Sequence, residues 1–382
     1  MVRQTWGEGA TDPNEKSRKE ELEMKRNGAV DFWKFVFSVV IMCFHSLYFA
    51  GSEKYVFFDG ANMVEYFFLV SGFLMAASVM KEGTQSPQPP VWKSTWQFLF
   101  HKIKSMCPEY YVAWAVSFLI KQVAGGLLPL HLIAKHAVLS IWELLFLRMA
   151  GFNDYNANGA TWYISAMLVA MLLLLPLFYK QKEFFLHMLA PVLAVGLIGY
   201  LYATEKTMRG NTDWMGICYK GLLRALGVLC LGCVCYLVCQ KMKEIPFTPF
   251  AKALLSFAET GGCLFALYWT YGHATSKMQF IILLLFAAAV TISFSHQGLF
   301  APLYDRPAVY WLGRFSFPLF LSHHAWSGRM NRMFPEDTYA QLFPKYLLLS
   351  VGTAFAVYVI SAWVRKLCAK YKDSLRQLFV QM

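Results

Sequence analysis

The clearest indication of the fold class is residues 30–50, which read VDFWKFVFSVVIMCFHSLYFA. The only acidic, basic or histidine side chains in this run of 21 residues are Asp31, Lys34 and His45. An α-helix needs about 20 mainly apolar residues to cross the hydrocarbon core of a bilayer. The stretch therefore predicts a transmembrane helix.

Similar apolar blocks recur along the whole chain of 382 residues. The hydrophobic share of 57% exceeds that of soluble domains, and with only 15% charged residues the composition excludes a disordered chain, a collagen and a coiled coil. We therefore predict an all-α polytopic membrane protein of about ten transmembrane helices. Beyond the first, the predicted spans lie near 61–80, 108–122, 160–179, 184–202, 215–239, 251–271, 278–296, 308–327 and 346–364.

Segment 131–149 is also apolar, but it contains Lys135, His136, Glu143 and Arg148. Charged side chains are costly in the middle of a bilayer. We therefore expect this segment to form an interfacial or re-entrant helix and not a full span.

The distribution of Lys and Arg predicts the orientation, since these residues gather in cytosolic segments. With the N-terminus inside, the cytosolic segments hold 21 of them and the extracytoplasmic segments hold 10. Both termini are then cytosolic, and despite the net charge of +12 no basic run suggests a nucleic-acid partner. Residues 1–25 are predicted to form a polar cytosolic tail, residues 26–368 a transmembrane domain, and residues 369–382 a second cytosolic tail. The transmembrane domain contains one long loop on each side of the membrane, a cytosolic loop at 81–107 and an extracytoplasmic loop at 121–159.

The cytosolic loop 81–107 shows helical periodicity. After a Pro- and Gln-rich linker at 84–90, aromatic and aliphatic residues recur at helical spacing with lysines between them, at Trp92, Trp96, Leu99, Ile103 and Met106. This pattern predicts an amphipathic helix that lies on the cytosolic membrane surface. The helix either anchors the loop to the lipid bilayer or binds an anionic ligand.

The nine cysteines include four within one predicted span, at Cys230, Cys233, Cys235 and Cys239. A disulfide framework would place cysteines in loops, and thiolate ligands of a metal are costly in lipid. We therefore interpret these four as small apolar packing residues and expect no metal site.

Ionisable groups inside membrane spans mark candidate functional sites because they are costly there. In the predicted topology Lys34 lies near the cytosolic end of its helix, whereas His45, Glu65 and His323 lie near the outer ends of theirs. Eleven residues bring Lys34 and His45 to nearly one helix face, about 16 Å apart along the axis. A long anionic ligand can contact both. The ionisable residues within the spans that we take as candidates are Lys34, His45, Glu65, Arg224, Arg314 and His323.

A histidine beside a carboxylate is a general base near neutral pH, because the carboxylate fixes the tautomer and stabilises the imidazolium. Glu65 shares the predicted depth of His45, so we expect it to orient this imidazole. His323 lies at the same depth and either belongs to the same site or forms a polar crosslink between helices.

Four ordered motifs resemble those of the acyltransferase-3 family of integral membrane O-acyltransferases. Residues 26–34, RNGAVDFWK, followed by His45, are similar to the first helix of that family, and residues 65–74, EYFFLVSGFL, to the second. The fourth and ninth helices are matched by WYIS at 162–165 and by LGRFS at 312–316 with LSH at 321–323. The resemblance covers nearly the whole chain.

This resemblance implies an enzyme that moves an acyl group, usually acetyl, from cytosolic acetyl-CoA to a hydroxyl on the outer side of the membrane. His45 corresponds to the catalytic histidine of the family and Lys34 to its partner in the same helix. The family usually carries an Arg-x-x-Arg pair before the proline that opens the third helix, whereas here Lys102 and Ser105 stand at those positions. The paired hydrogen bonds that an arginine donates to a phosphate are therefore missing at these two positions.

We accordingly predict an O-acetyltransferase of the plasma membrane or bacterial inner membrane that modifies a cell-envelope glycan or a lipid-linked saccharide. His45 acts as general base or as transient acyl carrier, with Glu65 orienting it. Some family members append a soluble esterase-like domain, so here transfer is either direct or completed by a separate transferase protein. The CoA phosphates are expected at Lys34, Lys102, Lys104 and His101, and the acceptor at Trp162, Asn158 and His323.

Two other classes fit the same residues. A proton-coupled secondary transporter of an anionic small molecule also needs buried Lys, His and Glu, but the two halves of the chain show no repeat of the kind that transporters often have. A haem protein with His45 and His323 as axial ligands is the third possibility.

Overall fold

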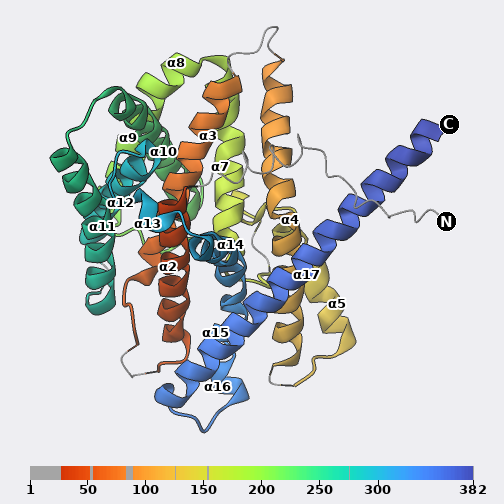
Figure 1. The fold of residues 1–382 in the computed structure, drawn as a ribbon. Helices are drawn as coiled ribbons and strands as arrows, with labels where there is room; N and C mark the ends of the chain where they lie inside the picture. Colours follow the sequence, from red (N-terminus) through yellow and green to blue (C-terminus); the bar gives the residue numbers. More distant parts are fainter. Residues whose placement is uncertain are drawn as a thin grey trace, which may run out of the picture.

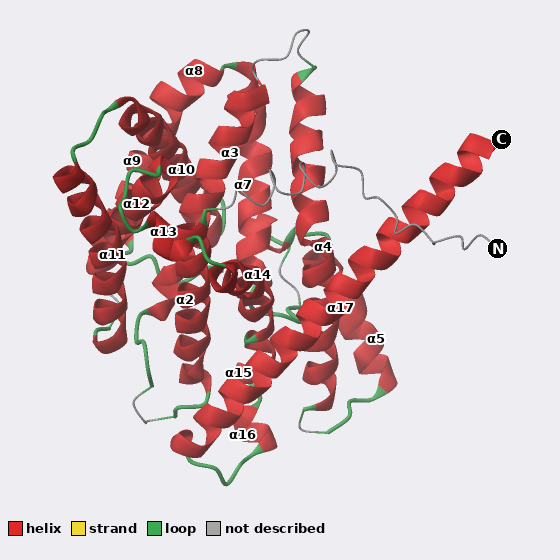
Figure 2. Ribbon diagram, in the orientation of Figure 1, coloured by secondary structure: helices red, strands yellow, loops and turns green. Residues whose placement is uncertain are grey.

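The computed structural model describes residues 27–51, 55–82, 89–124, 126–152, 155–274 and 276–381, with side chains described as far as Tyr371. The predicted tail 1–25, most of the linker 84–90 and nearly all side chains of the tail 369–382 lie outside this part. Within the described part the structure is helical and contains no strand (Figure 2). The predicted all-α class is thus confirmed.

Among the described residues, eight helical segments are long and apolar enough to cross a membrane. They correspond to eight of the ten predicted spans. In chain order they are α2 (Gly28–Phe44) with η1 (His45–Tyr48), η2 (Gly60–Met63) with α3 (Val64–Glu82), α7 (Thr161–Lys180), α8 (Lys182–Phe184) to α9 (Ala190–Thr204) through the π-helical turn η4 (Phe185–Leu189), α10 (Lys220–Glu244), α11 (Pro249–Gly272), α12 (Met278–Ser295) and α17 (Tyr339–Gln381).

The other two predicted spans are helices that are shorter or more polar. The span near 308–327 corresponds to α14 (Pro307–Ser322) followed by α15 (His324–Ser327), and α13 (Ala301–Tyr304) precedes it. The span near 108–122 is the second half of α4 (Val91–Val123).

The predicted helix at 92–106 is present, but it is not separate from the next predicted span, because α4 is one continuous helix of 33 residues. Its first half buries Ser94, Thr95 and Leu99, and α4 packs alongside α7 (Figure 1). Protein neighbours therefore cover part of the apolar face that the periodicity assigned to lipid. At 1.5 Å per residue the helix is about 50 Å long, which exceeds the hydrocarbon thickness.

Segment 131–149 forms three short pieces, none of which is long enough to cross a membrane. They are α5 (Leu130–Leu139), α6 (Ile141–Leu144) and η3 (Arg148–Ala150). The short helix α16 (Met330–Met333) lies at the same end of the bundle (Figure 1).

Two close helix contacts, both made through glycine, position the functional residues. A β-carbon on Gly72 of α3 would lie 2.1 Å from the carbonyl oxygen of Leu229 in α10, so only glycine allows this approach. Likewise, a β-carbon on Gly313 of α14 would lie 2.5 Å from Asp31 of α2. The first contact places Glu65 beside Arg224, and the second aligns α2 with α14.

The four cysteines of α10 are buried, which matches their predicted packing role. Cys233 donates a hydrogen bond to the carbonyl oxygen of Gly72, and Cys235 donates one to that of Ala287. Their thiols therefore fasten α10 to α3 and to α12.

Candidate active site

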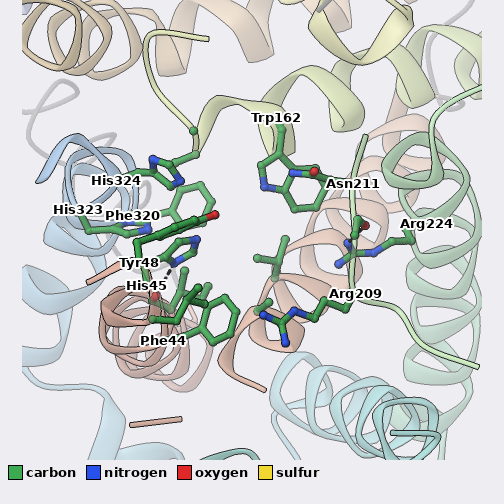
Figure 3. Close-up of a pocket in the computed structure, with 17 residues that line it drawn as sticks. Phe44, His45, Tyr48, Trp162, Arg209, Asn211, Arg224, Phe320, His323 and His324 are labelled. Carbon is green, nitrogen blue, oxygen red and sulfur yellow. Dashed lines mark hydrogen bonds between the residues drawn. The ribbon is translucent and has the colours of Figure 1, made fainter. Parts of the chain in front are cut away.

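A cavity of about 250 Å³ lies where η1, α7, α10, α14 and α15 meet the loop 205–219. We call it the histidine cavity. Figure 3 shows His45, Tyr48, His323 and His324 on one side of it and Arg209, Asn211 and Arg224 on the other, with Trp162 between the two sides. His45, His323 and Trp162 therefore line one cavity.

The three imidazoles are in mutual contact. The ring centroid of His45 lies 4.8 Å from that of His323 and 5.1 Å from that of His324. This direct contact leaves no room for a porphyrin between His45 and His323, so the interpretation as axial haem ligands is wrong.

The hydrogen bond of His45 defines its tautomer. Its Nδ1 lies 2.7 Å from the carbonyl oxygen of Ile41, one turn earlier in α2. A carbonyl oxygen can only accept, so Nδ1 carries the proton and Nε2 carries the lone pair. His323 has the same arrangement with Leu319 at 3.4 Å, and its buried Nε2 has no hydrogen-bond partner among the described residues. Two basic nitrogens therefore belong to side chains that line the cavity.

Glu65 does not contact His45, contrary to the prediction. Its Oε1 accepts hydrogen bonds from Nε of Arg224 at 2.9 Å and from Nη2 of the same guanidinium. Both side chains are buried, Glu65 completely. The sequence predicts the depth of Glu65 in the membrane. The direction in which its side chain points around the axis of α3 depends on the packing of α10, which contributes Arg224.

Trp162 and Asn158 were both predicted on the acceptor side, and only Trp162 lines the cavity. The guanidinium carbon of Arg224 lies 5.0 Å from the centroid of the Trp162 ring, which is a cation–π contact. Asn158 is fully buried, and its amide donates a 2.8 Å hydrogen bond to the carbonyl oxygen of Leu321 in α14. Asn158 therefore fastens the loop before α7 to α14 and is a positioning residue.

Glu143 holds the loop before α7 in place through hydrogen bonds. Its carboxylate accepts hydrogen bonds from the backbone N–H groups of Ala157 and Asn158 and from the hydroxyl of Thr161. The loop then presents the backbone of Gly159 to the imidazole of His324. This ionisable residue of segment 131–149 thus supports the site indirectly.

A second, larger cavity of about 720 Å³ opens between α2, α3, α4, α7, α14 and α17. We call it the cationic cavity, because its lining includes Lys34, Lys102, Arg314 and Arg365. Arg314 packs against the rings of three aromatic residues, with its guanidinium carbon 5.4 to 5.8 Å from the centroids of Tyr310, Trp311 and Tyr358. Arg365 of α17 donates hydrogen bonds to Glu109 and to the carbonyl oxygen of Ser105 in α4.

The three lysines and one histidine predicted to bind CoA do not all lie at one site. Lys34 and Lys102 line the cationic cavity. His101 lines a smaller neighbouring cavity that shares Lys102 and Ser105 with it. Lys104 is exposed and is not among the residues that line either of them.

Phe320 lines both the histidine cavity and the cationic cavity, and it is the one residue common to the two described linings. Its ring centroid lies 5.6 Å from those of Phe67 and Tyr163 and 6.0 Å from that of His323. The two cavities are thus stacked along α2, with Lys34 at one and His45 at the other, and Phe320 stands between them.

Sequence reasoning assigned no specific role to six of the polar or charged lining residues. Arg224 and Arg314 were visible as charges inside spans, and His324 directly follows a predicted site residue. Arg209 and Asn211 lie in a loop without periodicity, so no pattern marked them. Arg365 appeared only as one of the cytosolic charges.

Comparison with known proteins identifies the family. The model of the acyltransferase-3 family, described as an acyltransferase domain, matches residues 27–364. No curated protein and no solved structure matches the chain significantly. The match begins at the residue that caps α2 and ends inside α17, and it includes the whole lining of the histidine cavity and all of that of the cationic cavity except Arg365. The chain therefore belongs to the acyltransferase-3 family of membrane acyltransferases.

Proposed function

We propose that this protein transfers an acetyl group from cytosolic acetyl-CoA to a hydroxyl of an extracytoplasmic cell-envelope glycan or lipid-linked saccharide. The observation that carries the proposal is the pair of stacked cavities on α2, one lined by cations and one by histidines, whose linings share only Phe320 among the described residues. Donor and acceptor enter from opposite sides of the membrane, and the thioester reaches His45 near Phe320. The proposed location is the plasma membrane or bacterial inner membrane.

The cationic cavity suits acyl-CoA. Lys34, Lys102 and Arg314 supply positive charge for the phosphates, while Phe67, Val70 and other apolar residues suit the pantetheine arm. Lysine binds phosphate as a point charge, and arginine adds paired donors in one plane. Arg314 and Arg365 thus supply the guanidinium groups that the Lys102–Ser105 segment lacks.

His45 acts as the general base in the direct mechanism. Its Nε2 takes the proton of the acceptor hydroxyl while the hydroxyl oxygen attacks the thioester carbonyl. The C–S bond then breaks, and the departing thiolate takes the proton from the imidazolium, which gives free CoA and the O-acetyl ester. The hydrogen bond from Nδ1 to the Ile41 carbonyl keeps Nε2 unprotonated before the reaction and stabilises the imidazolium.

The acyl-carrier route uses the same atoms in two steps. Nε2 of His45 attacks the thioester carbonyl, the C–S bond breaks, CoA leaves as the thiolate, and an acyl-imidazolium that keeps the Nδ1 proton forms. A second base must then deprotonate the acceptor, and the neighbouring imidazoles of His323 and His324 are in contact with His45. Only this route gives ping-pong kinetics. A separate transferase protein is required only if the purified chain transfers acetyl to no acceptor.

The test is release of free CoA thiol from acetyl-CoA by the detergent-purified protein, with and without a glycan fraction from the cell envelope. We expect release that glycan stimulates and that His45→Ala abolishes. His187→Ala is the matched control, because His187 lies in η4 outside both cavities. If acetyl-CoA neither binds nor loses its acetyl group, the proposal fails. Uptake by proteoliposomes then tests the proton-coupled transporter.

A further inference from the structure

The wall of the histidine cavity that faces the imidazoles is built from two arginines and an asparagine (Figure 3). Arg224 extends from α10, and Arg209 and Asn211 flank Gly210 in the loop 205–219. No carboxylate lines the cavity within the described part of the chain. We call this surface the arginine wall.

Arg224 is held rigidly but keeps donors available. Its Nε and Nη2 donate to Oε1 of Glu65, and its Nη1 donates to the carbonyl oxygen of Gly210 at 2.7 Å. A guanidinium has five N–H groups, so these bonds leave two of them for a ligand. Glu65 is fully buried behind Arg224 and is not among the lining residues, so it fixes the guanidinium without occupying the cavity.

The loop that supplies Arg209 is also fastened. Gly210 has a φ of +97°, and a β-carbon there would lie 2.0 Å from Oδ2 of Asp213, so the turn requires glycine. The backbone N–H of Arg209 donates to the hydroxyl of Thr207 at 2.9 Å, and the guanidinium carbon lies 5.2 Å from the centroid of the Phe44 ring. Both arginines are therefore positioned before any ligand binds.

Preorganised guanidinium groups recognise carboxylates and phosphates in particular, because their planar donors match paired acceptor oxygens. A neutral sugar does not need two guanidinium groups, since single amide and hydroxyl groups of the protein can form hydrogen bonds with its hydroxyls. A volume of about 250 Å³ is below the usual range for small-molecule sites, about 300 to 1,000 Å³. The occupant is therefore one small unit and not a long chain.

We propose that the acceptor unit carries a carboxylate or phosphate, which binds Arg209 and Arg224 while the hydroxyl to be acylated faces His45. This inference rests on the proposed function for the identity of the reaction. It adds the substrate class: an acidic sugar or a sugar phosphate. The arginine wall then fixes which hydroxyl of that unit reaches Nε2 of His45.

The first experiment compares matched acceptors in the thiol-release assay, namely methyl glucoside, methyl glucuronide and glucose 1-phosphate. We expect kcat/KM for at least one anionic acceptor to exceed that for methyl glucoside tenfold or more. The better of the two anions identifies the substituent as carboxylate or phosphate. In Arg209→Gln the ratio of anionic to neutral kcat/KM should fall tenfold or more. Arg332→Gln removes the same charge from an exposed position outside the cavity and should retain the wild-type ratio.

The second experiment measures binding without acyl transfer, so that failure of this inference and failure of the proposed function are distinguishable. Diethyl pyrocarbonate modifies accessible imidazoles, and peptide mass spectrometry reads the modification of His45. Glucuronate or glucose 1-phosphate should protect His45 in wild type and Arg332→Gln but not in Arg209→Gln, whereas glucose should not protect it. Equal protection by glucose, or no protection by either anion, overturns the inference. Anion-specific protection without any thiol release supports the anion site and contradicts the acyltransferase proposal.

Discussion

Gly159 lies so close to His324 that a β-carbon on it would come within 2.2 Å of the imidazole Cε1. Hydrogen bonds to two other segments hold this loop against His324. Glu143 holds the backbone N–H groups on the N-terminal side of Gly159, and the Asn158 side chain binds the carbonyl oxygen of Leu321. The backbone of this loop thus forms part of the wall behind the three histidines, and only a glycine leaves space for His324.

Gly159→Ala should therefore reduce acyl transfer strongly, tenfold or more, because His324 must move toward His45. A displacement of about 1 Å near reacting groups can cost about a hundredfold in rate. The measurement is kcat for CoA release together with the thermal unfolding midpoint in detergent. Gly261→Ala is the control, since its β-carbon meets nothing within 4 Å, and it should leave both quantities near wild type. Full activity in Gly159→Ala would show that His324 can shift without consequence.

Glu65 and Arg224 form a buried ion pair, and we expect Glu65→Gln to destabilise the protein by about 3–5 kcal/mol because it leaves the guanidinium without a counter-charge. The double variant Glu65→Gln/Arg224→Gln should recover part of this loss, since it removes both charges. Unfolding in detergent, measured for both single variants and the double variant, gives the coupling free energy. If Glu65 instead orients His45 directly, Glu65→Gln lowers kcat and leaves stability unchanged.

Part of this site follows from the sequence and part does not. Helical periodicity predicts Lys34 and His45 on one face of the first helix, and the structure places Lys34 of α2 and His45, the first residue of η1, at the two stacked cavities. The common depth of His45 and His323 follows from hydropathy and the distribution of charges, and their rings are indeed in contact. The helix face on which a residue lies depends on that helix alone, and its depth depends on how the helix crosses the membrane. Neither depends on how the helices pack together.

The partner of Glu65 could not be predicted, because it depends on how α3 and α10 rotate against each other at Gly72. The role of Arg209 was equally inaccessible, since the conformation of its loop depends on the tertiary contacts of Thr207 and Gly210. The packing of residues 92–106 against α7 could not be predicted for a related reason. An amphipathic face is satisfied equally by lipid headgroups and by α7, and periodicity does not distinguish them.

Lys34 should contribute to acyl-CoA binding through charge. Lys34→Met is expected to raise KM for acetyl-CoA at least tenfold, because hydrogen bonds to charged groups contribute about 1.5–3 kcal/mol. KM for acetyl-pantetheine, which lacks the nucleotide and its phosphates, should change much less. Lys104→Met removes an exposed lysine of the same region and should leave both KM values unchanged. Equal effects of Lys34→Met on both donors would place Lys34 away from the phosphates.

Phe320 is the barrier between the two cavities, and its removal should uncouple thioester cleavage from transfer. In the proposed mechanism, water and acceptor approach His45 from the histidine cavity, and the Phe320 ring, which packs against Phe67 and Tyr163, separates His45 from the cationic cavity. Phe320→Ala opens a passage, so that water reaches the thioester along a second path. We expect hydrolysis of acetyl-CoA without acceptor to rise several-fold relative to transfer with acceptor.

The control for this change must account for lost packing, because truncating a buried phenylalanine costs about 3–5 kcal/mol by itself. Phe286→Ala removes an equally large ring that is fully buried against Phe37 and Tyr66 and that lines neither cavity. It should lower the unfolding midpoint as much as Phe320→Ala does, with an unchanged ratio of hydrolysis to transfer. A raised ratio in both variants would trace the leak to general loosening of the bundle. A raised ratio in Phe320→Ala alone assigns the barrier to this ring, since stability would then be matched and only the connection between the cavities would differ.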